Sequence, residues 1–168
     1  LKKISAHLKD LKISFKRFNA IDGTKVSNKV LLKNMKVSGP LGVLSDGDRA
    51  CFQSHYNLWK LLSISENGPV MVLEDDVVLS KNAPKILRKI DWIPNNSQII
   101  KLDRFGNEKH KILISKKSYD LNSNYKLHYL LSKHGGTGGY IITPKGIETL
   151  LSIKDCVDVS VDHYLFNP

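Results

Sequence analysis

The sequence contains few cysteines and lacks the long apolar runs that a membrane-spanning helix requires. Its two cysteines, Cys51 and Cys156, lie far apart and match no zinc-binding spacing, so we expect a reducing, cytoplasmic setting. No apolar run approaches the roughly 20 residues that cross a bilayer. A secretory signal sequence is not visible, because Leu1-Lys2-Lys3 leads directly into an amphipathic pattern.

Acidic residues are clearly outnumbered. The chain has 26 Lys and Arg residues against 16 Asp and Glu residues, a formal net charge of +10. This charge favours anionic partners such as phosphorylated substrates, nucleic acid or an anionic membrane surface. Because the lysines are scattered and do not interleave with aromatic residues, we expect no nucleic-acid partner. An enzyme in peripheral contact with an anionic membrane fits the charge better.

The size and the apolar pattern favour one α/β domain. The chain has 168 residues, of which 41% are hydrophobic and 25% charged, an ordinary globular balance. The apolar run at 70–73 is typical of a strand buried on both faces, so we predict a mixed, mainly parallel sheet flanked by helices. Helices are predicted over residues 1–11, 45–62, 82–90 and 143–151, and strands over 13–20, 70–73, 98–102, 111–115, 125–131 and 140–142.

A strand normally precedes the first helix of an α/β domain, and none precedes this one. We therefore expect that the first strand is missing. At the other end, the chain stops at Asn167-Pro168 without a terminating element. The expectation is a single domain over residues 1–168, trimmed at both ends.

Three consecutive acids, Glu74, Asp75 and Asp76, follow the predicted strand at 70–73. Ligands in open α/β sheets lie beyond the carboxyl ends of the strands, so chemistry is expected here. Three neighbouring carboxylates repel one another, and a divalent ion such as Mg²⁺ or Mn²⁺ would relieve that repulsion. A solvated acidic turn that caps the next helix is the alternative.

Two further features each allow a functional and a structural interpretation. His55 lies on the apolar stripe of the helix predicted over 45–62, where a core histidine with a satisfied hydrogen bond is the more common case. The run His134-Gly135-Gly136-Thr137-Gly138-Gly139 allows close approach to a ligand or to another backbone. A tight loop that leads into a strand explains this run at least as well, since no Lys-Ser/Thr pair follows it.

Five segments, taken in order, resemble glycosyltransferase family 25, the lipooligosaccharide galactosyltransferases of Gram-negative bacteria with their collagen-modifying relatives. Each motif alone is weak, but together they are specific and cover nearly the whole chain. The segments are Phe18-Asn19-Ala20-Ile21-Asp22-Gly23, Ala50-Cys51-Phe52-Gln53-Ser54-His55 with Leu58-Trp59, Leu73-Glu74-Asp75-Asp76-Val77, Gly136-Thr137-Gly138-Gly139-Tyr140-Ile141-Ile142 with Pro144-Lys145-Gly146, and Val161-Asp162-His163.

The resemblance implies a GT-A-like, Rossmann-like fold. It also implies an inverting transfer of a hexose from a UDP-sugar to a glycan or lipooligosaccharide hydroxyl, with galactose as the leading candidate for the hexose. It places Glu74-Asp75-Asp76 at the family's counterpart of the Asp-x-Asp motif. Asp76 would be the main ligand of Mn²⁺ or Mg²⁺, Glu74 would assist it, and Asp75 would hold the metal's water shell or the donor ribose. For such an enzyme the positive charge favours a cytoplasmic location, at the inner face of the inner membrane, where acceptor lipid and phospholipids are anionic.

The resemblance also implies roles for other residues. An inverting transfer needs a general base for the acceptor hydroxyl. Asp162 is our candidate for this base, with helix capping as its structural alternative and Asp103 as the reserve. The remaining residues are expected to line the donor pocket (Asp22, Gly23, Ser54, His55 and Asp103) or to form a wall near donor and acceptor (His134, Gly135, Gly136, Thr137 and His163).

One departure from the family pattern leaves a second function open. Family members begin with an apolar strand and a basic turn that should help to hold the nucleotide, and here the chain begins beyond them. The alternative is therefore a truncated or inactive family member that acts as a binding module for anionic glycan or lipid.

Overall fold

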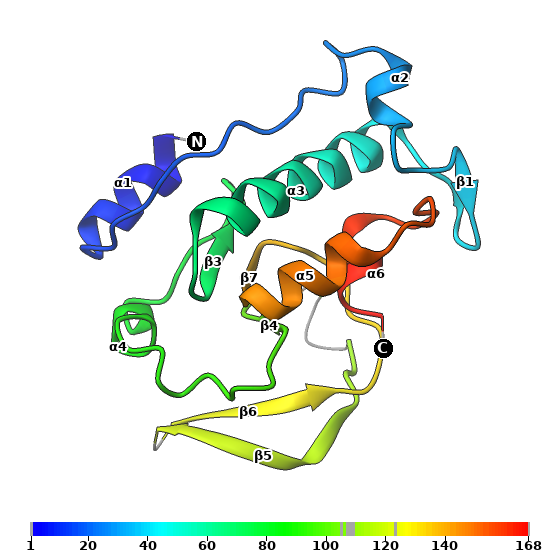
Figure 1. Cartoon of the computed structure of the whole chain (residues 1–168). Coiled ribbons are helices and arrows are strands. Elements are labelled where there is room, and N and C mark those ends of the chain that lie inside the picture. Colours follow the sequence, from blue (N-terminus) through cyan, green and yellow to red (C-terminus); the bar gives the residue numbers. More distant parts are fainter. Residues whose placement is uncertain (1, 105, 107–109, 123, 168) are drawn as a thin grey trace.

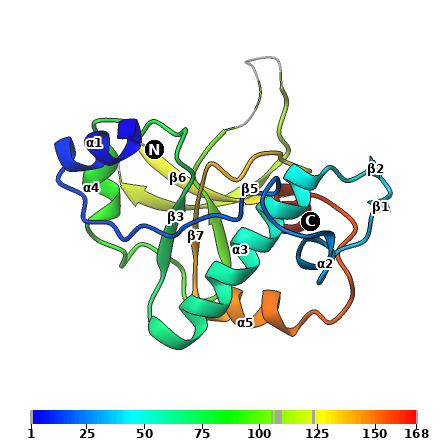
Figure 2. The same ribbon diagram turned by 90° about the horizontal axis from the view of Figure 1, so that it is seen from above.

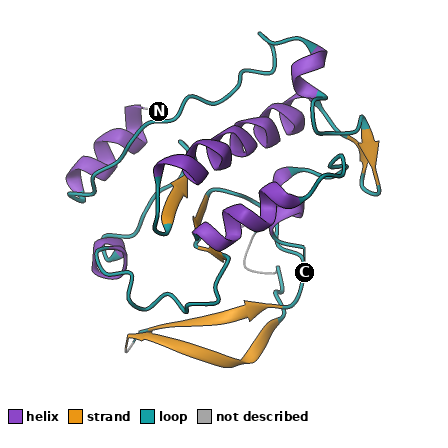
Figure 3. Ribbon diagram, viewed as in Figure 1, coloured by secondary structure: helices purple, strands orange, loops and turns teal. Residues whose placement is uncertain are grey.

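The computed structural model describes residues 2–104, 106, 110–122 and 124–167. It contains a small central sheet, two helices at residues 46–65 and 144–152 that pack together, and a separate β-hairpin at residues 114–130 (Figure 1, Figure 3). In chain order the elements are α1 (Lys2–Asp10), α2 (Asn28–Leu31), β1 (Ser38–Gly39), β2 (Gly42–Val43), α3 (Asp46–Ser65), β3 (Val70–Leu73), α4 (Ala83–Leu87), β4 (Ile99–Lys101), β5 (Ile114–Asn122), β6 (Tyr125–Leu130), β7 (Gly139–Ile142), α5 (Pro144–Ser152) and α6 (Val161–Leu165).

Local signals set the starts of α3 and α5. Ser45 and Asp48 form the predicted capping box of α3: the Ser45 hydroxyl accepts from the Asp48 N–H at 3.1 Å, and the Asp48 carboxylate accepts from the Ser45 N–H at 2.8 Å. Thr143 caps α5 by accepting from the Gly146 N–H at 3.1 Å, with Pro144 in the first turn. Both helices begin where the sequence predicts.

The central sheet has the strand order β3-β7-β4, and β7 pairs with both neighbours in antiparallel register. The α/β class is confirmed, but the expected mainly parallel sheet is wrong for the described strands, whose ladders are all antiparallel. An apolar run indicates that a strand is buried, but it does not indicate whether the neighbouring strands are parallel or antiparallel to it. All four residues of β7 are buried because β7 is the middle strand.

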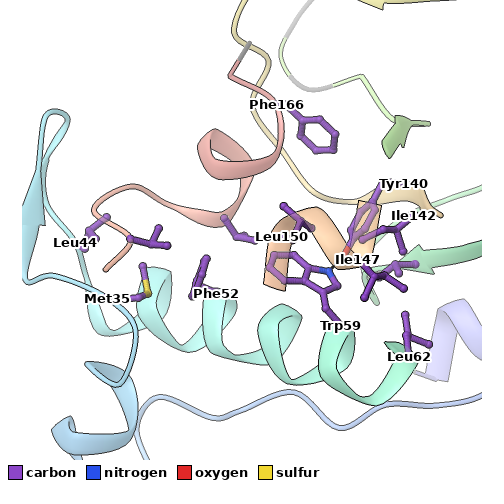
Figure 4. Close-up of a cluster of buried hydrophobic side chains, with 13 residues drawn as sticks. Met35, Leu44, Phe52, Trp59, Leu62, Tyr140, Ile142, Ile147, Leu150 and Phe166 are labelled. Atoms are coloured by element: carbon purple, nitrogen blue, oxygen red, sulfur yellow. Dashed lines mark hydrogen bonds between the residues drawn. The ribbon is translucent and has the colours of Figure 1, made fainter. Parts of the chain in front are cut away.

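One face of the sheet is covered by α3 and α5, which pack against each other (Figure 2). Trp59 of α3 and Tyr140 of β7 are both fully buried there, and Ile142 beside Tyr140 is buried as well (Figure 4). Ile147 and Leu150 of α5 close this core. The core therefore anchors β7 from one side, and β7 in turn places the glycine-rich loop before it.

The strand expected over residues 13–20 does not form, and the helix expected over 82–90 is limited to α4. Residues 13–20 are extended but pair with no described strand; Lys16 forms an ion pair with Glu66 at 2.9 Å, and the Ile21 N–H donates to Ser54 Oγ at 2.8 Å. Asn82 precedes α4 in helical geometry and makes no side-chain cap.

At two further places the structure extends an expected element. The strand expected at 111–115 begins at Ile114 and runs through Lys116-Lys117 to Asn122, because the pairing with β6 continues to that point. A short helix, α6, also forms at Val161–Leu165. None of the helices in the described parts of the chain combines the length and the apolar character that a bilayer crossing needs.

Candidate active site

Three loops meet at one edge of the central sheet. Because β3 and β4 both run antiparallel to β7, their carboxyl ends lie beside the amino end of β7. Glu74 therefore follows β3 next to the loop that precedes β7, and its N–H donates to the Gly138 carbonyl at 2.9 Å. The Leu102 N–H makes the equivalent bond to Gly139 at 2.9 Å. The acids that follow β3 and β4 therefore lie at the same edge of the sheet, although the strand directions differ from those expected.

The Glu74 carboxylate points into this edge and is held from two sides. The Thr137 hydroxyl donates to Glu74 Oε1 at 2.5 Å, and His55 Nε2 lies 3.6 Å from the same oxygen. The contact with His55 has the largest influence and lowers the pKa of Glu74; burial opposes it, and the Thr137 hydrogen bond adds to it. Glu74, His55 and Thr137, all predicted as site residues, are thus brought together with an ionised carboxylate at their centre.

A buried chain of hydrogen bonds fixes the tautomer of His55. The indole N–H of Trp59 donates to the Tyr140 hydroxyl at 3.0 Å, and His55 Nδ1 lies 2.8 Å from the same oxygen. Tyr140 is fully buried, and His55 Nδ1 is the acceptor within reach of its hydroxyl proton among the described residues. Nδ1 therefore accepts, the neutral ring carries its proton on Nε2, and that N–H faces Glu74.

Lys101 is a site residue that the sequence reasoning missed. Its side chain is only 12% exposed; Nζ lies 2.9 Å from Asp103 Oδ1, donates to the Gly136 carbonyl, and stands 4.2 Å from the centre of the Phe166 ring. The available signal was a lysine inside the apolar run 99–102, because a cation is rarely buried without a partner. Lys101 joins Asp103, which the sequence did predict, to the glycine-rich loop.

Asp162 fastens the same loop from the other side. Its carboxylate accepts from the Gly136 N–H at 3.0 Å, from the Ser160 hydroxyl at 2.5 Å and from the His163 N–H at 2.9 Å. Burial alone would raise the pKa of Asp162, but these hydrogen bonds and the nearby His163 outweigh it and lower the pKa. Three donors make the carboxylate a weaker base and a good clamp for Gly136.

The glycines of this loop have steric reasons to be glycine. Gly136 has a φ of 81°, in the left-handed region that side chains rarely adopt. A Cβ on Gly138 would lie 2.9 Å from Val77 Cγ1 and 3.4 Å from Asp103 Oδ2. The loop can therefore pass close to the segments that follow β3 and β4.

The predicted wall residues beside these glycines are largely engaged within the protein. His134 is buried; its ring Nδ1–H donates to the Gly135 carbonyl at 2.9 Å, and its backbone N–H donates to Phe166 at 3.1 Å. His163 follows Asp162 in α6, and its Nδ1 is buried without a hydrogen-bond partner among the described residues. His134 thus fixes the backbone of the loop, and the role of these residues as a wall near donor and acceptor stays a prediction.

Asp75 and Asp76 lie in the turn after Glu74, and both are exposed. Asp76 makes no hydrogen bond or ion pair with the part of the chain that the structure describes, so its carboxylate oxygens are available to a ligand. Mg²⁺ and Mn²⁺ prefer one or two carboxylates together with phosphate oxygens and water. An exposed Asp76 next to the ionised Glu74 fits this preference.

A second group of ligand atoms lies deeper in the site. Cys51, His55 and Glu74 each offer one ligand atom, and these three atoms lie within 4.8 Å of one another. Burial, with a contribution from Glu74, raises the pKa of the Cys51 thiol to about 11. Ligation by His55 Nε2 would also displace the proton that the Tyr140 hydrogen bond places there. This group is therefore better suited to hydrogen bonding than to holding a hard cation.

Asp22, Gly23 and Ser54 were predicted to line the donor pocket, but their polar groups have structural partners. Ser54 Oγ donates to the Ala50 carbonyl at 2.7 Å and accepts from the Ile21 N–H, as described above. Hydrogen bonds from Thr24 and Lys25 lower the pKa of the exposed Asp22 to about 2. A Cβ on Gly23 would lie 3.0 Å from the Asp46 carbonyl oxygen. Gly23 and Ser54 lie where the chain before α2 contacts the first half of α3, whereas Asp22 contacts its neighbours Thr24 and Lys25.

A pocket of about 320 Å³ lies elsewhere, between the other face of the sheet and α4. Met71 and Ile141 from the sheet contribute to its lining, together with Lys12 and Leu87. It contains none of the predicted site residues.

Comparison with known proteins identifies the class to which this site belongs. The family described as "Glycosyltransferase family 25 (LPS biosynthesis protein)" matches residues 1–165. The chain belongs to this glycosyltransferase family, as its motifs predicted.

Individual relatives agree with the family match. A protein of Haemophilus influenzae is 29% identical over 157 residues, which are 92% of this chain and 54% of the relative. The "Lipooligosaccharide biosynthesis protein lic2B" of the same species is 31% identical over 74% of this chain and 49% of its own length. The "Lacto-N-neotetraose biosynthesis glycosyltransferase LgtE" of Neisseria meningitidis is 30% identical over 83% and 50%. The chain thus spans about half the length of these relatives.

Proposed function

We propose that this chain forms part of an enzyme that transfers a hexose, galactose in the first instance, from a UDP-sugar to a hydroxyl of lipooligosaccharide or a related glycan. The reaction is metal-dependent and inverting, and it takes place in the cytoplasm at the inner membrane. The observation that carries the proposal is the meeting of Glu74 and Asp103 with the glycine-rich loop at one sheet edge, with Asp76 in the turn directly after Glu74. Family membership and the biosynthetic names of the relatives support the substrate class.

Asp76 and Glu74 are the residues that would hold the divalent ion, and Asp75 lies beside them. A bound ion supplies a Lewis acid that offsets the charge on the departing UDP. His55 and Thr137 keep Glu74 ionised and fixed in orientation, so the site is arranged before the substrate arrives. Lys101 contributes by binding Asp103 and the Gly136 carbonyl, which holds the glycine-rich loop against the end of β4.

The general base is proposed to be Asp162, with Asp103 in reserve. The three hydrogen bonds to Asp162 lower its basicity, whereas Asp103 accepts from Lys101 through Oδ1 and has its Oδ2 next to Gly138. The two assignments predict different kinetics. If Asp162 is the base, Asp162→Asn abolishes turnover while UDP binding stays intact, and Asp103→Asn is milder. The opposite order would transfer the role to Asp103.

Calorimetric titration of UDP tests the core of the proposal. Binding is expected with Mn²⁺ and is expected to disappear with chelator and in Asp76→Ala. Asp91→Ala is the matched control, because Asp91 is also exposed but lies in the segment that leads to the amino end of β4, at the opposite edge of the sheet. Binding that ignores both metal and Asp76 would refute the metal site. Equal loss in the control would show a non-specific effect of charge.

The net charge of +10 favours a second function, a binding module for anionic glycan or lipid. This module would bind its ligand with no nucleotide and no metal. A protein that binds lipooligosaccharide but fails to bind UDP under any condition would support the module over the transferase.

A further inference from the structure

The segment 111–133, here called the basic hairpin, is set apart from the rest of the fold. Its strands β5 and β6 pair only with each other among the described strands, and no described helix or strand packs extensively against them. Figure 1 shows the hairpin at the lower edge of the molecule, away from α3 and α5. A two-stranded hairpin is marginally stable by itself in water, so a surface that covers it would stabilise it.

The basic hairpin concentrates positive charge. It contains five lysines and one acid, Asp120, a net charge of +4 within a chain of +10. Among the described residues only Lys126 has a carboxylate partner, Asp120, at 3.5 Å, and both side chains are mostly exposed. The remaining lysines, among them Lys116 and Lys117, are available to an anionic partner.

The same hairpin carries an exposed aromatic and apolar face. Strand alternation places Tyr125, Leu127 and Tyr129 of β6 on one face, and the register adds Tyr119 opposite Leu127. Tyr125 is 40% exposed and Tyr129 is 48% exposed. Leu130 points to the other face and packs against the hydrophobic core. The exposed face therefore belongs to the side of β6 that the core does not use.

We propose that the basic hairpin is the element through which the protein docks on an anionic lipid bilayer. Tyrosine side chains are favoured at the boundary between lipid and water, where the ring lies among apolar groups and the hydroxyl stays wet. Lysines next to them are attracted by anionic head groups. A nucleic-acid partner would use the lysines but would leave Leu131, which is 51% exposed, without a role.

The position of the hairpin in the chain relates membrane docking to the candidate active site. In the sequence the hairpin lies between Asp103 and His134, which both belong to the candidate active site. A bilayer bound there would hold a lipid-linked acceptor close to Glu74 and the glycine-rich loop. This relation rests on the proposed transfer to a lipooligosaccharide, whereas the docking itself does not require it.

Vesicle sedimentation with the full chain tests the inference. We expect binding to vesicles that contain phosphatidylglycerol, weak binding to pure phosphatidylcholine, and release at high salt. The double substitution Lys116→Ala/Lys117→Ala should weaken binding by about tenfold or more. Lys29→Ala/Lys33→Ala is the matched control, because it removes the same charge from two exposed lysines. These lysines lie at or near α2, at the opposite edge of the molecule in Figure 1.

A second substitution separates the aromatic contribution from charge. Tyr125→Ser/Leu131→Ser should weaken vesicle binding at unchanged net charge, with the far-UV circular dichroism preserved. Equal weakening in the Lys29/Lys33 control, or no binding to anionic vesicles at low salt, would overturn the inference. UDP titration of the same variants distinguishes the docking proposal from the transferase proposal. The hairpin variants should retain metal-dependent UDP binding even when vesicle binding is lost.

Discussion

Removal of one hydroxyl group, by Tyr140→Phe, should disturb both the core and the candidate site. The Tyr140 hydroxyl is shared by Trp59 and His55, at 3.0 and 2.8 Å, and all three side chains are buried. Phenylalanine fills nearly the same volume, so the change deletes hydrogen bonds without opening a large cavity. It leaves the Trp59 indole N–H and the His55 Nδ1 without a partner.

The expected loss follows from those two groups. A buried donor or acceptor left unsatisfied costs about 1–3 kcal/mol, so we expect the free energy of unfolding to fall by about 3 kcal/mol. Urea denaturation measures this loss as a shift of the midpoint at unchanged slope. Tyr164→Phe is the matched control: its hydroxyl makes one long bond, 3.4 Å to Leu150, and should cost less than about 1 kcal/mol.

The nitrogen chemical shifts of His55 provide an independent readout. In the native protein we expect the proton on Nε2, and in Tyr140→Phe we expect a mixture of tautomers, because Nδ1 no longer has its donor. A loss of stability no larger than that of Tyr164→Phe would refute the shared hydroxyl. A native His55 with its proton on Nδ1 would refute the direction of the hydrogen-bond chain.

Three further predictions concern the same edge of the sheet. The pKa of Glu74 is held below its ordinary value of 4.5, so its carboxylate stabilises the fold above that pH and this contribution disappears as the pH falls through the lower pKa of the folded state. The stability difference between native protein and Glu74→Gln should therefore shrink on acidification, and a difference independent of pH would contradict the assignment. Gly138→Ala should lower stability by about 1–3 kcal/mol, seen in thermal unfolding, because its Cβ would press on Val77, and no change would show that the loop can shift. Lys101→Met and Asp103→Asn should show a coupling energy above about 0.5 kcal/mol in a double-mutant cycle. Additive losses of stability would mean that their ion pair contributes nothing to stability.

Short-range signals predicted the elements that carry the site. The Ser45 and Asp48 spacing placed the start of α3, and the Thr143-Pro144 pair placed the start of α5, because a cap is decided by residues within one helical turn. The apolar run at 70–73 placed β3, and the acids after it were correctly expected at a sheet edge. The family motifs selected Glu74, His55 and Thr137, which the structure brings into contact.

Long-range pairing was the part that the sequence could not supply. The direction of β7 between β3 and β4 depends on contacts between residues about 70 positions apart for β3 and about 40 for β4, and no local pattern encodes it. The role of Tyr140 in fixing His55 is hidden for the same reason, since a tyrosine in an apolar strand looks like an ordinary core residue. Lys101 carried a signal, a cation within a buried run, but its partner Gly136 becomes visible only in the fold.

The antiparallel course of β7 also shapes how the chain can vary. Lys101 at the end of β4 lies opposite Tyr140 near the start of β7, so the segment between them leaves and re-enters the sheet at adjacent points. A segment anchored in this way can be lengthened, shortened or exchanged at little entropic cost to the pairing of the strands. The sheet and its acids can therefore be kept as a constant frame, while the segment between β4 and β7 is exchanged for another of different length or surface.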